Sequence, residues 1–207
     1  MKSSFFENFC SQACQNKERV AVILEKSGIE ISYGKLLRDT QTVAVYLVSN
    51  GVRTGEVVAS KLPDGYPALL LFLASSALGV KYAPCSQDDP SALNRISACV
   101  KVDHLITTAE KVGENIGSFN VLKMLENYAE QDIPELPIMP EKQLSASLFL
   151  LTSGSTGEPK IMVINNTKLW QSAMYFNSLY PTITSESRFW NYLPMNYLGG
   201  LFNLAVI

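Results

Sequence analysis

A short run of small and hydroxylated residues ends in a lysine at residues 152–160, with the sequence TSGSTGEPK. Its glycines let backbone N–H groups approach an anion, because no Cβ stands in the way. The serine and threonine hydroxyls add hydrogen-bond donors, and Lys160 adds a positive charge behind the stiffening Pro159. These residue types together are suited to holding the phosphates of a nucleotide.

A flexible linker and an ordinary hairpin are the two alternatives for this stretch. A linker is typically flanked by polar sequence, but residues 147–152 and 160–164 are mostly apolar and resemble strands. A hairpin commonly uses about two to five loop residues, and this connection needs roughly seven. We therefore favour the phosphate-binding interpretation. The stretch is not a Walker A loop, because Pro159 precedes Lys160 and Ile161 follows it.

The rest of the chain predicts the elements that would carry this loop. An apolar β-branched run predicts a buried strand at residues 19–24. Further strands are predicted at residues 57–62, 80–83, 102–107, 147–152, 161–165 and 188–193. Helices are predicted from a Ser4–Glu7 capping box, over 32–50 and 67–79, from the Asp-Asp-Pro at 88–90, and over 167–180. Alternating strands and helices indicate an α/β fold, a mainly parallel sheet with helices on both faces.

The spacing of prolines and charges suggests how the chain is divided. Residues 126–145 contain Pro134, Pro137 and Pro140 among acidic residues, which disfavours a regular element. We expect a first α/β subdomain over residues 1–125 and a proline-rich acidic connection over 126–146. Residues 147–207 would then begin the nucleotide-binding region.

Composition narrows the classes of function. The chain has 207 residues, of which 47% are hydrophobic and 17% charged, with a formal net charge of −2. No long basic run is present, so nothing indicates a nucleic acid or an anionic membrane surface as partner. The apolar run at 67–80 is too short to cross a bilayer, and the N-terminus does not resemble a signal peptide. We therefore expect a cytoplasmic protein without a membrane span.

Metal and histidine chemistry are disfavoured by the same composition. The four cysteines form no Cys-x-x-Cys pair, and His104 is the one histidine, so no metal site is assigned. Buried reduced thiols are the simpler interpretation of the cysteines. His104 lies in a predicted strand, where a structural imidazole is the expectation, and core packing is the default for Trp170 and Trp190.

Five segments of the sequence resemble the motifs of a known family. The stretch TSGSTGEPK resembles the signature loop of the AMP-forming adenylate enzymes, which include acyl-CoA synthetases, luciferases and peptide-synthetase adenylation domains. Four other segments resemble the family's motifs in the same order: ISYGKLL at 31–37, GVRTGEVVASKL at 51–62, SSALGVKYAPCSQ at 75–87 and LPMNYLGGL at 193–201.

The resemblance implies a reaction in which ATP and a carboxylic acid give an acyl-adenylate and pyrophosphate. A thiol, coenzyme A or a carrier thiol, would then capture the acyl group, and Mg²⁺ would accompany ATP. The substrate carboxylate would itself be the nucleophile, so no side chain is assigned a catalytic role. By resemblance, the phosphate-binding residues are Thr152, Ser153, Gly154, Ser155, Thr156, Gly157 and Lys160.

Two departures from the family qualify this expectation. In LPMNYLGGL, Tyr197 stands where the family usually has histidine, and Asn196 replaces an aromatic residue; with Gly199 they form the expected acyl-pocket region. The chain also lacks the family's later motifs and ends in the apolar residues 201–207. We expect the N-terminal fragment of a ligase, inactive alone, whose apolar end is covered by the remaining fold or by an oligomeric partner. The alternative is a non-catalytic binding or assembly module derived from that family.

Overall fold

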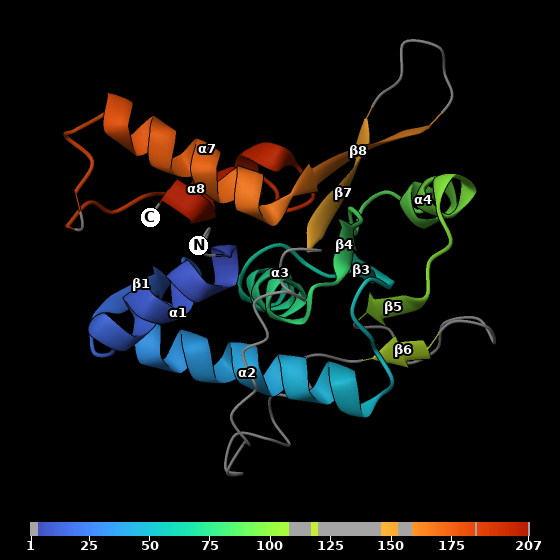
Figure 1. The fold of residues 1–207 in the computed structure, drawn as a ribbon, viewed down its shortest axis with the longest axis horizontal. Coiled ribbons are helices and arrows are strands. Elements are labelled where there is room, and N and C mark those ends of the chain that lie inside the picture. The colour runs from blue at the N-terminus through green and yellow to red at the C-terminus, as the bar shows by residue number, and fades with distance from the viewer. Residues whose placement is uncertain (1–3, 108–116, 120–145, 153–158, 185, 207) are drawn as a thin grey trace.

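The computed structural model describes residues 4–107, 117–119, 146–152, 159–184 and 186–206 (Figure 1). Its centre is a six-stranded sheet with the strand order β6-β5-β3-β4-β7-β8. The strands of this sheet are β3 (Val57–Lys61), β4 (Lys81–Pro84), β5 (His104–Thr107), β6 (Gly117–Phe119), β7 (Ser147–Thr152) and β8 (Lys160–Asn165). A separate two-stranded sheet pairs β1 (Val20–Ile23) with β2 (Glu30–Ser32).

The six-stranded sheet is parallel except at one edge. β3 lies between β4 and β5 and is parallel to both, and the pairs β5–β6 and β4–β7 are parallel as well. β8 returns antiparallel to β7 and forms the edge of the sheet. The prediction of a mainly parallel sheet is therefore confirmed, with one antiparallel hairpin at the end where the phosphate-binding residues were expected.

Helices cover both faces of the sheet, as the sequence predicted. The helices are α1 (Phe5–Gln15), α2 (Tyr33–Ser49), α3 (Tyr66–Leu78), α4 (Ala92–Cys99), α7 (Asn166–Leu179) and α8 (Leu198–Val206). One apolar cluster joins the sheet to α1, α2, α3, α7 and α8, and a second joins the opposite face to α4. In Figure 1, α1 lies between α2 and α7, and α8 lies beside α7.

Side chains of the central strands alternate between these two clusters. In β7, Leu148 and Leu150 belong to the larger cluster, whereas Phe149 between them belongs to the smaller one. Successive residues of a strand point to opposite faces, so a strand covered on both faces is apolar throughout. This explains why residues 147–152 form a continuous apolar run and why their strand is fixed along its length.

Local sequence signals set several helix boundaries as predicted. Ser4 caps α1: its Oγ accepts from the Glu7 backbone N–H at 3.1 Å, and the Glu7 carboxylate accepts from the Ser4 N–H at 2.6 Å. Ser32 caps α2 in the same way by accepting from Lys35 N at 3.2 Å. The α3 helix is buried over most of its length, which confirms the predicted core helix at 67–79. No helix of the described residues is long and apolar enough to cross a membrane.

Residues 19–24 do not form the buried strand that was predicted. β1 pairs antiparallel with β2 outside the main sheet, and its first and last residues, Val20 and Ile23, are exposed. Its apolar residues cover only the flank of the helical layer, where Ala21 and Val22 pack against the larger cluster. A short apolar run does not specify which sheet it joins, because that choice depends on contacts distant in the sequence.

The predicted strand at 188–193 is also wrong. These residues have no strand partner in the described chain, and the aromatic residues among them, Phe189, Trp190 and Tyr192, are exposed. Aromatic residues favour strands only when a neighbouring strand and a packing surface are available. The expectation that Trp190 packs in the core is wrong for the same reason, whereas Trp170 packs edge-on against Phe5.

Smaller differences concern α4 and the thiols. α4 begins at Ala92 and not at the Asp-Asp-Pro sequence, because Asp89 instead accepts from the backbone N–H of Ser91 at 2.9 Å ahead of the helix. All four cysteines are free, but only Cys85 is buried. The proline-rich connection predicted at 126–146 lies outside the described residues except for Ala146, so the proposed subdivision of the chain stays a prediction.

We expect Ser4→Ala to lower the free energy of unfolding by about 1 kcal/mol, since it removes the N-cap of α1. Urea denaturation of the purified chain measures this change. Ser11→Ala is the matched control, because Ser11 is exposed within the same helix and caps nothing. A Ser4 variant as stable as the Ser11 variant would show that the capping box contributes nothing.

A second prediction concerns the buried hydroxyl pair on β3 and β4, Ser60 and Tyr82. Ser60 Oγ and Tyr82 Oη lie 2.9 Å apart, and both residues are buried. Tyr82→Phe leaves the Ser60 hydroxyl unpaired, so it should destabilise the chain by about 1–3 kcal/mol. The double variant Tyr82→Phe/Ser60→Ala should recover part of this loss, because both polar groups are then absent. Additive losses in denaturant unfolding would exclude a coupled pair.

Candidate functional site

The β7–β8 hairpin holds the first and last of the predicted phosphate-binding residues opposite each other. Thr152 ends β7 and Lys160 begins β8, and the two are register partners in the antiparallel pair. The Thr152 hydroxyl donates to the Lys160 carbonyl at a long 3.4 Å. The connection between them therefore runs from residue 153 to residue 159, as expected for a loop longer than an ordinary hairpin turn.

Lys160 presents an exposed ammonium group at the base of this loop. Within the described part of the chain, no carboxylate lies within ion-pairing distance of it. The remaining predicted phosphate-binding residues lie outside the described residues: Ser153, Gly154, Ser155, Thr156 and Gly157.

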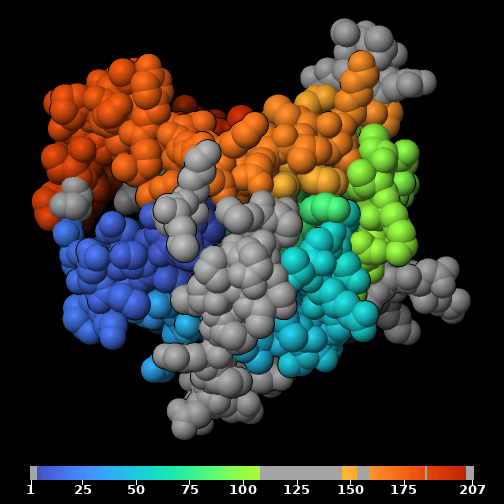
Figure 2. Space-filling view, viewed as in Figure 1, coloured from blue at the N-terminus to red at the C-terminus, as the bar shows by residue number. Residues whose placement is uncertain are grey.

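The exit of the loop has a contact that the sequence did not indicate. Cys99, at the end of α4, donates from Sγ to the carbonyl of Pro159 at 3.3 Å. Figure 2 shows α4, in green, beside the orange surface of β8 at this end of the molecule. Nothing in the local sequence around Cys99 pointed to it, because the two residues are separated by 60 positions.

The loop of the hairpin follows the carboxyl end of β7, and ligand sites are common at this end of the strands in α/β folds. β3, β4 and β7 are neighbours and parallel, so their carboxyl ends lie at the same edge. Ligands typically bind outside the carboxyl ends of parallel strands. Asp64 follows β3, Cys85 follows β4, and the predicted phosphate loop follows β7. Burial raises the pKa of the Cys85 thiol to about 11, so this thiol stays protonated and unreactive at neutral pH.

The predicted acyl-pocket region is a tight turn that leads into α8. The carbonyl of Pro194 accepts from the Tyr197 N–H at 3.1 Å, which closes the turn. A Cβ added at Gly200 would lie 2.3 Å from the Pro194 carbonyl oxygen, so only glycine fits where α8 folds back on the turn. Asn191 adds a second tie by donating to the Gly200 carbonyl at 3.0 Å.

The three predicted residues of this region differ in exposure. Asn196 and Gly199 are half-buried, whereas the Tyr197 side chain is 60% exposed. Of the described residues, none forms a hydrogen bond or ion pair that joins Lys160 to Asn196 or Tyr197. The two predicted regions therefore have no direct polar link among the described residues, although both are anchored in the larger apolar cluster.

Sequence analysis missed the contact that attaches this turn to the sheet. Asp64 Oδ1 accepts from the backbone N–H of Met195 at 2.7 Å. A signal was available in the Asp-Gly pair after the predicted strand 57–62, since such pairs form turns. Its partner could not be inferred, because Met195 lies 131 residues away.

The described residues contain no cluster of metal-ligating side chains. No group of three or more histidine, cysteine or acidic side chains in the described ranges is close enough to hold a metal ion. Magnesium commonly keeps several waters and is bound through substrate phosphates and one or two carboxylates. We therefore assign no step to a metal held by these residues.

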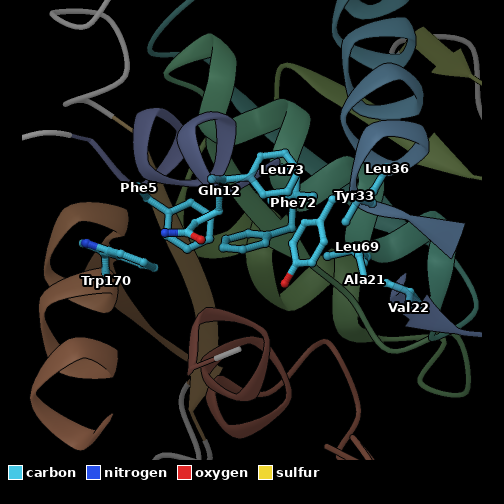
Figure 3. A pocket seen from close by; sticks show the side chains of 11 residues that line it. Phe5, Gln12, Ala21, Val22, Tyr33, Leu36, Leu69, Phe72, Leu73 and Trp170 are labelled. Carbon is cyan, nitrogen blue, oxygen red and sulfur yellow. The ribbon is translucent and has the colours of Figure 1, made fainter. Parts of the chain in front are cut away.

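A pocket of about 100 Å³ lies elsewhere, among α1, β1, α2, α3 and α7 (Figure 3). Its walls are mainly apolar, and Thr152, Lys160, Asn196, Tyr197 and Gly199 do not line it. Among the described lining residues Tyr33 is the one that can titrate, and burial raises the pKa of this phenol, so it does not ionise near neutral pH. The pocket thus offers no catalytic group for the predicted reaction.

Comparisons with known proteins agree with the geometry. The acetyl-coenzyme A synthetase of Emericella nidulans is 33% identical over 189 residues, which cover 72% of this chain and 28% of that protein. The hybrid PKS-NRPS synthetase apdA of the same organism is 30% identical over 141 residues, which cover 66% of this chain and 4% of that protein. The chain thus matches only a minor part of the length of these relatives.

Solved structures show the same fold. The o-succinylbenzoate CoA synthetase of Bacillus subtilis, in complex with an acyl-adenylate intermediate, superposes with a TM-score of 0.81 at 20% identity, covering 99% of this chain and 53% of that chain. The N-terminal subdomain of Klebsiella oxytoca NpsA gives a TM-score of 0.70 at 21% identity, covering 83% and 43%. The family model described as AMP-binding enzyme matches residues 9–207, so this chain belongs to the AMP-binding enzyme family.

Proposed function

We propose that this chain is the N-terminal part of an ATP-dependent, AMP-forming carboxylic acid ligase, and that its β7–β8 loop holds the β- and γ-phosphates of ATP. The observation that carries the proposal is the pairing of Thr152 with Lys160 at the base of a glycine-, serine- and threonine-rich loop. Lys160 is exposed and has no ion-pair partner among the described residues, so its ammonium group would be able to contact a phosphate held by the loop. The family membership and the acetyl-coenzyme A synthetase relative support this reaction class.

In the proposed reaction, an oxygen of the substrate carboxylate attacks the α-phosphorus of ATP. The bond between the α-phosphorus and the bridging oxygen to the β-phosphate breaks, which releases pyrophosphate and leaves an acyl-adenylate. Negative charge increases on the leaving pyrophosphate in the transition state, so fixed donors aimed at it lower the barrier. Lys160 would supply one such positive charge, and Thr152 one hydroxyl once it exchanges its long bond to the Lys160 carbonyl for the ligand.

The acid and the acceptor are proposed only by class. The Asn196–Gly199 turn would form one side of the acyl pocket, and Mg²⁺ would arrive with the ATP phosphates. Coenzyme A or a carrier thiol would take the acyl group, in keeping with the acetyl-coenzyme A synthetase and the hybrid PKS-NRPS synthetase to which the chain is similar. The chain spans 53% and 43% of the two solved neighbours. The sites for adenosine and for the thiol acceptor are therefore proposed for the whole protein and not for this chain by itself. A cytoplasmic location likewise stays an expectation from the sequence.

We predict that Lys160→Ala lowers the rate of acid-dependent exchange of labelled pyrophosphate into ATP by about tenfold or more, because one charged hydrogen bond to a phosphate is worth about 1.5–3 kcal/mol. The assay uses the protein that carries this chain, with a panel of carboxylic acids. Lys168→Ala is the matched control: Lys168 is also exposed and lies one element further along, in α7. If the Lys160→Ala variant exchanges pyrophosphate at the wild-type rate, the role assigned to the loop is ruled out.

The alternative of a non-catalytic module is favoured by Tyr197, at the position where the family usually has histidine. Its exposed phenol makes no described hydrogen bond through its side chain and is free to serve a binding surface instead of a pocket. The same assay separates the two functions. If the wild-type protein binds ATP yet exchanges pyrophosphate with none of the acids, the module interpretation replaces the ligase.

A further inference from the structure

We propose that Asp64 is a positioning residue for the acyl-pocket turn: its carboxylate fixes the backbone of Met195 and thereby orients Asn196 and Tyr197. The inference rests on the proposed function for the role of the turn, but the contact itself is independent of it. Asp64 would act on the selection and orientation of the carboxylic acid and not on ATP.

The contact is a short, charge-assisted hydrogen bond between distant parts of the chain. Asp64 Oδ1 accepts from Met195 N at 2.7 Å. Bonds between an ionised acceptor and a neutral donor are roughly twice as strong as bonds between neutral groups. Met195 itself is 5% exposed and belongs to the larger apolar cluster. The packing of its side chain therefore also fixes the position of its backbone amide.

Asp64 has a rigid support. It lies between β3, which is buried at the centre of the sheet, and α3, which is buried over most of its length. The next residue, Gly65, has φ 110° and ψ −144°, a conformation essentially restricted to glycine. A backbone fixed in this way leaves Asp64 little freedom, so its carboxylate is presented to Met195 in advance of any ligand.

The turn that Asp64 contacts is held together by hydrogen bonds at both ends. Asn191 donates to the Gly200 carbonyl, and Asn203 donates to Asn191 Oδ1 at 3.1 Å, so both ends of the turn are tied together. The missing side chain of Gly200 allows its close approach to the Pro194 carbonyl. A shift of the Met195 amide would therefore be passed to Asn196 and Tyr197, which follow it directly.

The exposure of the two partners argues for positioning rather than for folding. The Asp64 residue is exposed, whereas the burial of Met195 and Leu201 already attaches the turn and α8 to the core. Removing the carboxylate leaves those apolar contacts intact. We therefore expect the turn to stay folded but to lose its fixed orientation at the edge of the sheet that carries the phosphate loop.

The test compares Asp64→Ala with Asp88→Ala in the protein that carries this chain. Asp88 is an exposed carboxylate after β4 at the same edge of the sheet, and its side chain makes no described contact with the turn. We expect Asp64→Ala to raise the KM for the carboxylic acid in pyrophosphate exchange by about tenfold while the KM for ATP stays unchanged. Asp88→Ala should change neither constant. Hydrogen exchange at the Met195 amide should become faster in Asp64→Ala only.

The outcomes separate this inference from the proposed function. An unchanged KM for the acid in Asp64→Ala, with Lys160→Ala impaired, overturns the positioning role and leaves the ligase in place. If the wild-type protein shows no pyrophosphate exchange with any acid, the ligase function fails. In that case an unchanged rate of hydrogen exchange at the Met195 amide in Asp64→Ala would overturn the contact as well. Should Asp64→Ala not fold, Asp64→Asn decides: its neutral oxygen still accepts, so a smaller rise in the acid KM supports the role and no rise overturns it.

Discussion

The burial of β7 between two apolar layers is the constraint on which the candidate site depends. Leu148 and Leu150 pack into the larger cluster and Phe149 into the smaller one, so the strand cannot rotate or slide. β8 is held by β7 through a full ladder from Ser147–Asn165 to Thr152–Lys160. A loop with both ends fixed in this way loses less conformational freedom on binding an anion, which leaves more of the interaction energy for affinity.

The features that sequence could predict are those determined within a few residues. The Ser4–Glu7 capping box, the apolar helix α3 and the strand β7 each follow from a local pattern, and each is confirmed with boundaries close to those expected. The identity of the sheet that a strand joins is not local. Residues 19–24 and 188–193 have the composition of strands, but the first joins a small separate sheet and the second has no strand partner in the described chain.

The same distinction applies to the site. The residue types of the loop predicted where Thr152 and Lys160 would lie, because a loop between two adjacent strands is a local arrangement. The contacts made by Cys99 with Pro159 and by Asp64 with Met195 join residues 60 and 131 positions apart. Cys99 and Asp64 do not belong to any motif that the sequence analysis recognised. Only the packing of α4 and α8 brings them within reach of Pro159 and Met195. Sequence therefore predicted the strands on either side of the loop, but it did not predict the distant contacts that hold the loop and the turn.

One sheet thus supports two regions through different polar contacts. The hairpin is held by β7 and by Cys99 of α4, whereas the Leu193–Leu201 turn is held by Asp64, by Asn191 and by the burial of Met195. No described hydrogen bond or ion pair joins the two regions, but Leu148 and Leu150 of β7 pack in the same larger apolar cluster as Met195. Substitutions of these buried residues are therefore expected to affect both regions, whereas substitutions at exposed positions should stay local. Tyr197 is exposed, so it can stand where the resembled motif usually has histidine without changing the contacts that hold Thr152 and Lys160. Under the proposed function, a change at Tyr197 would affect the acid and leave the nucleotide contacts in place.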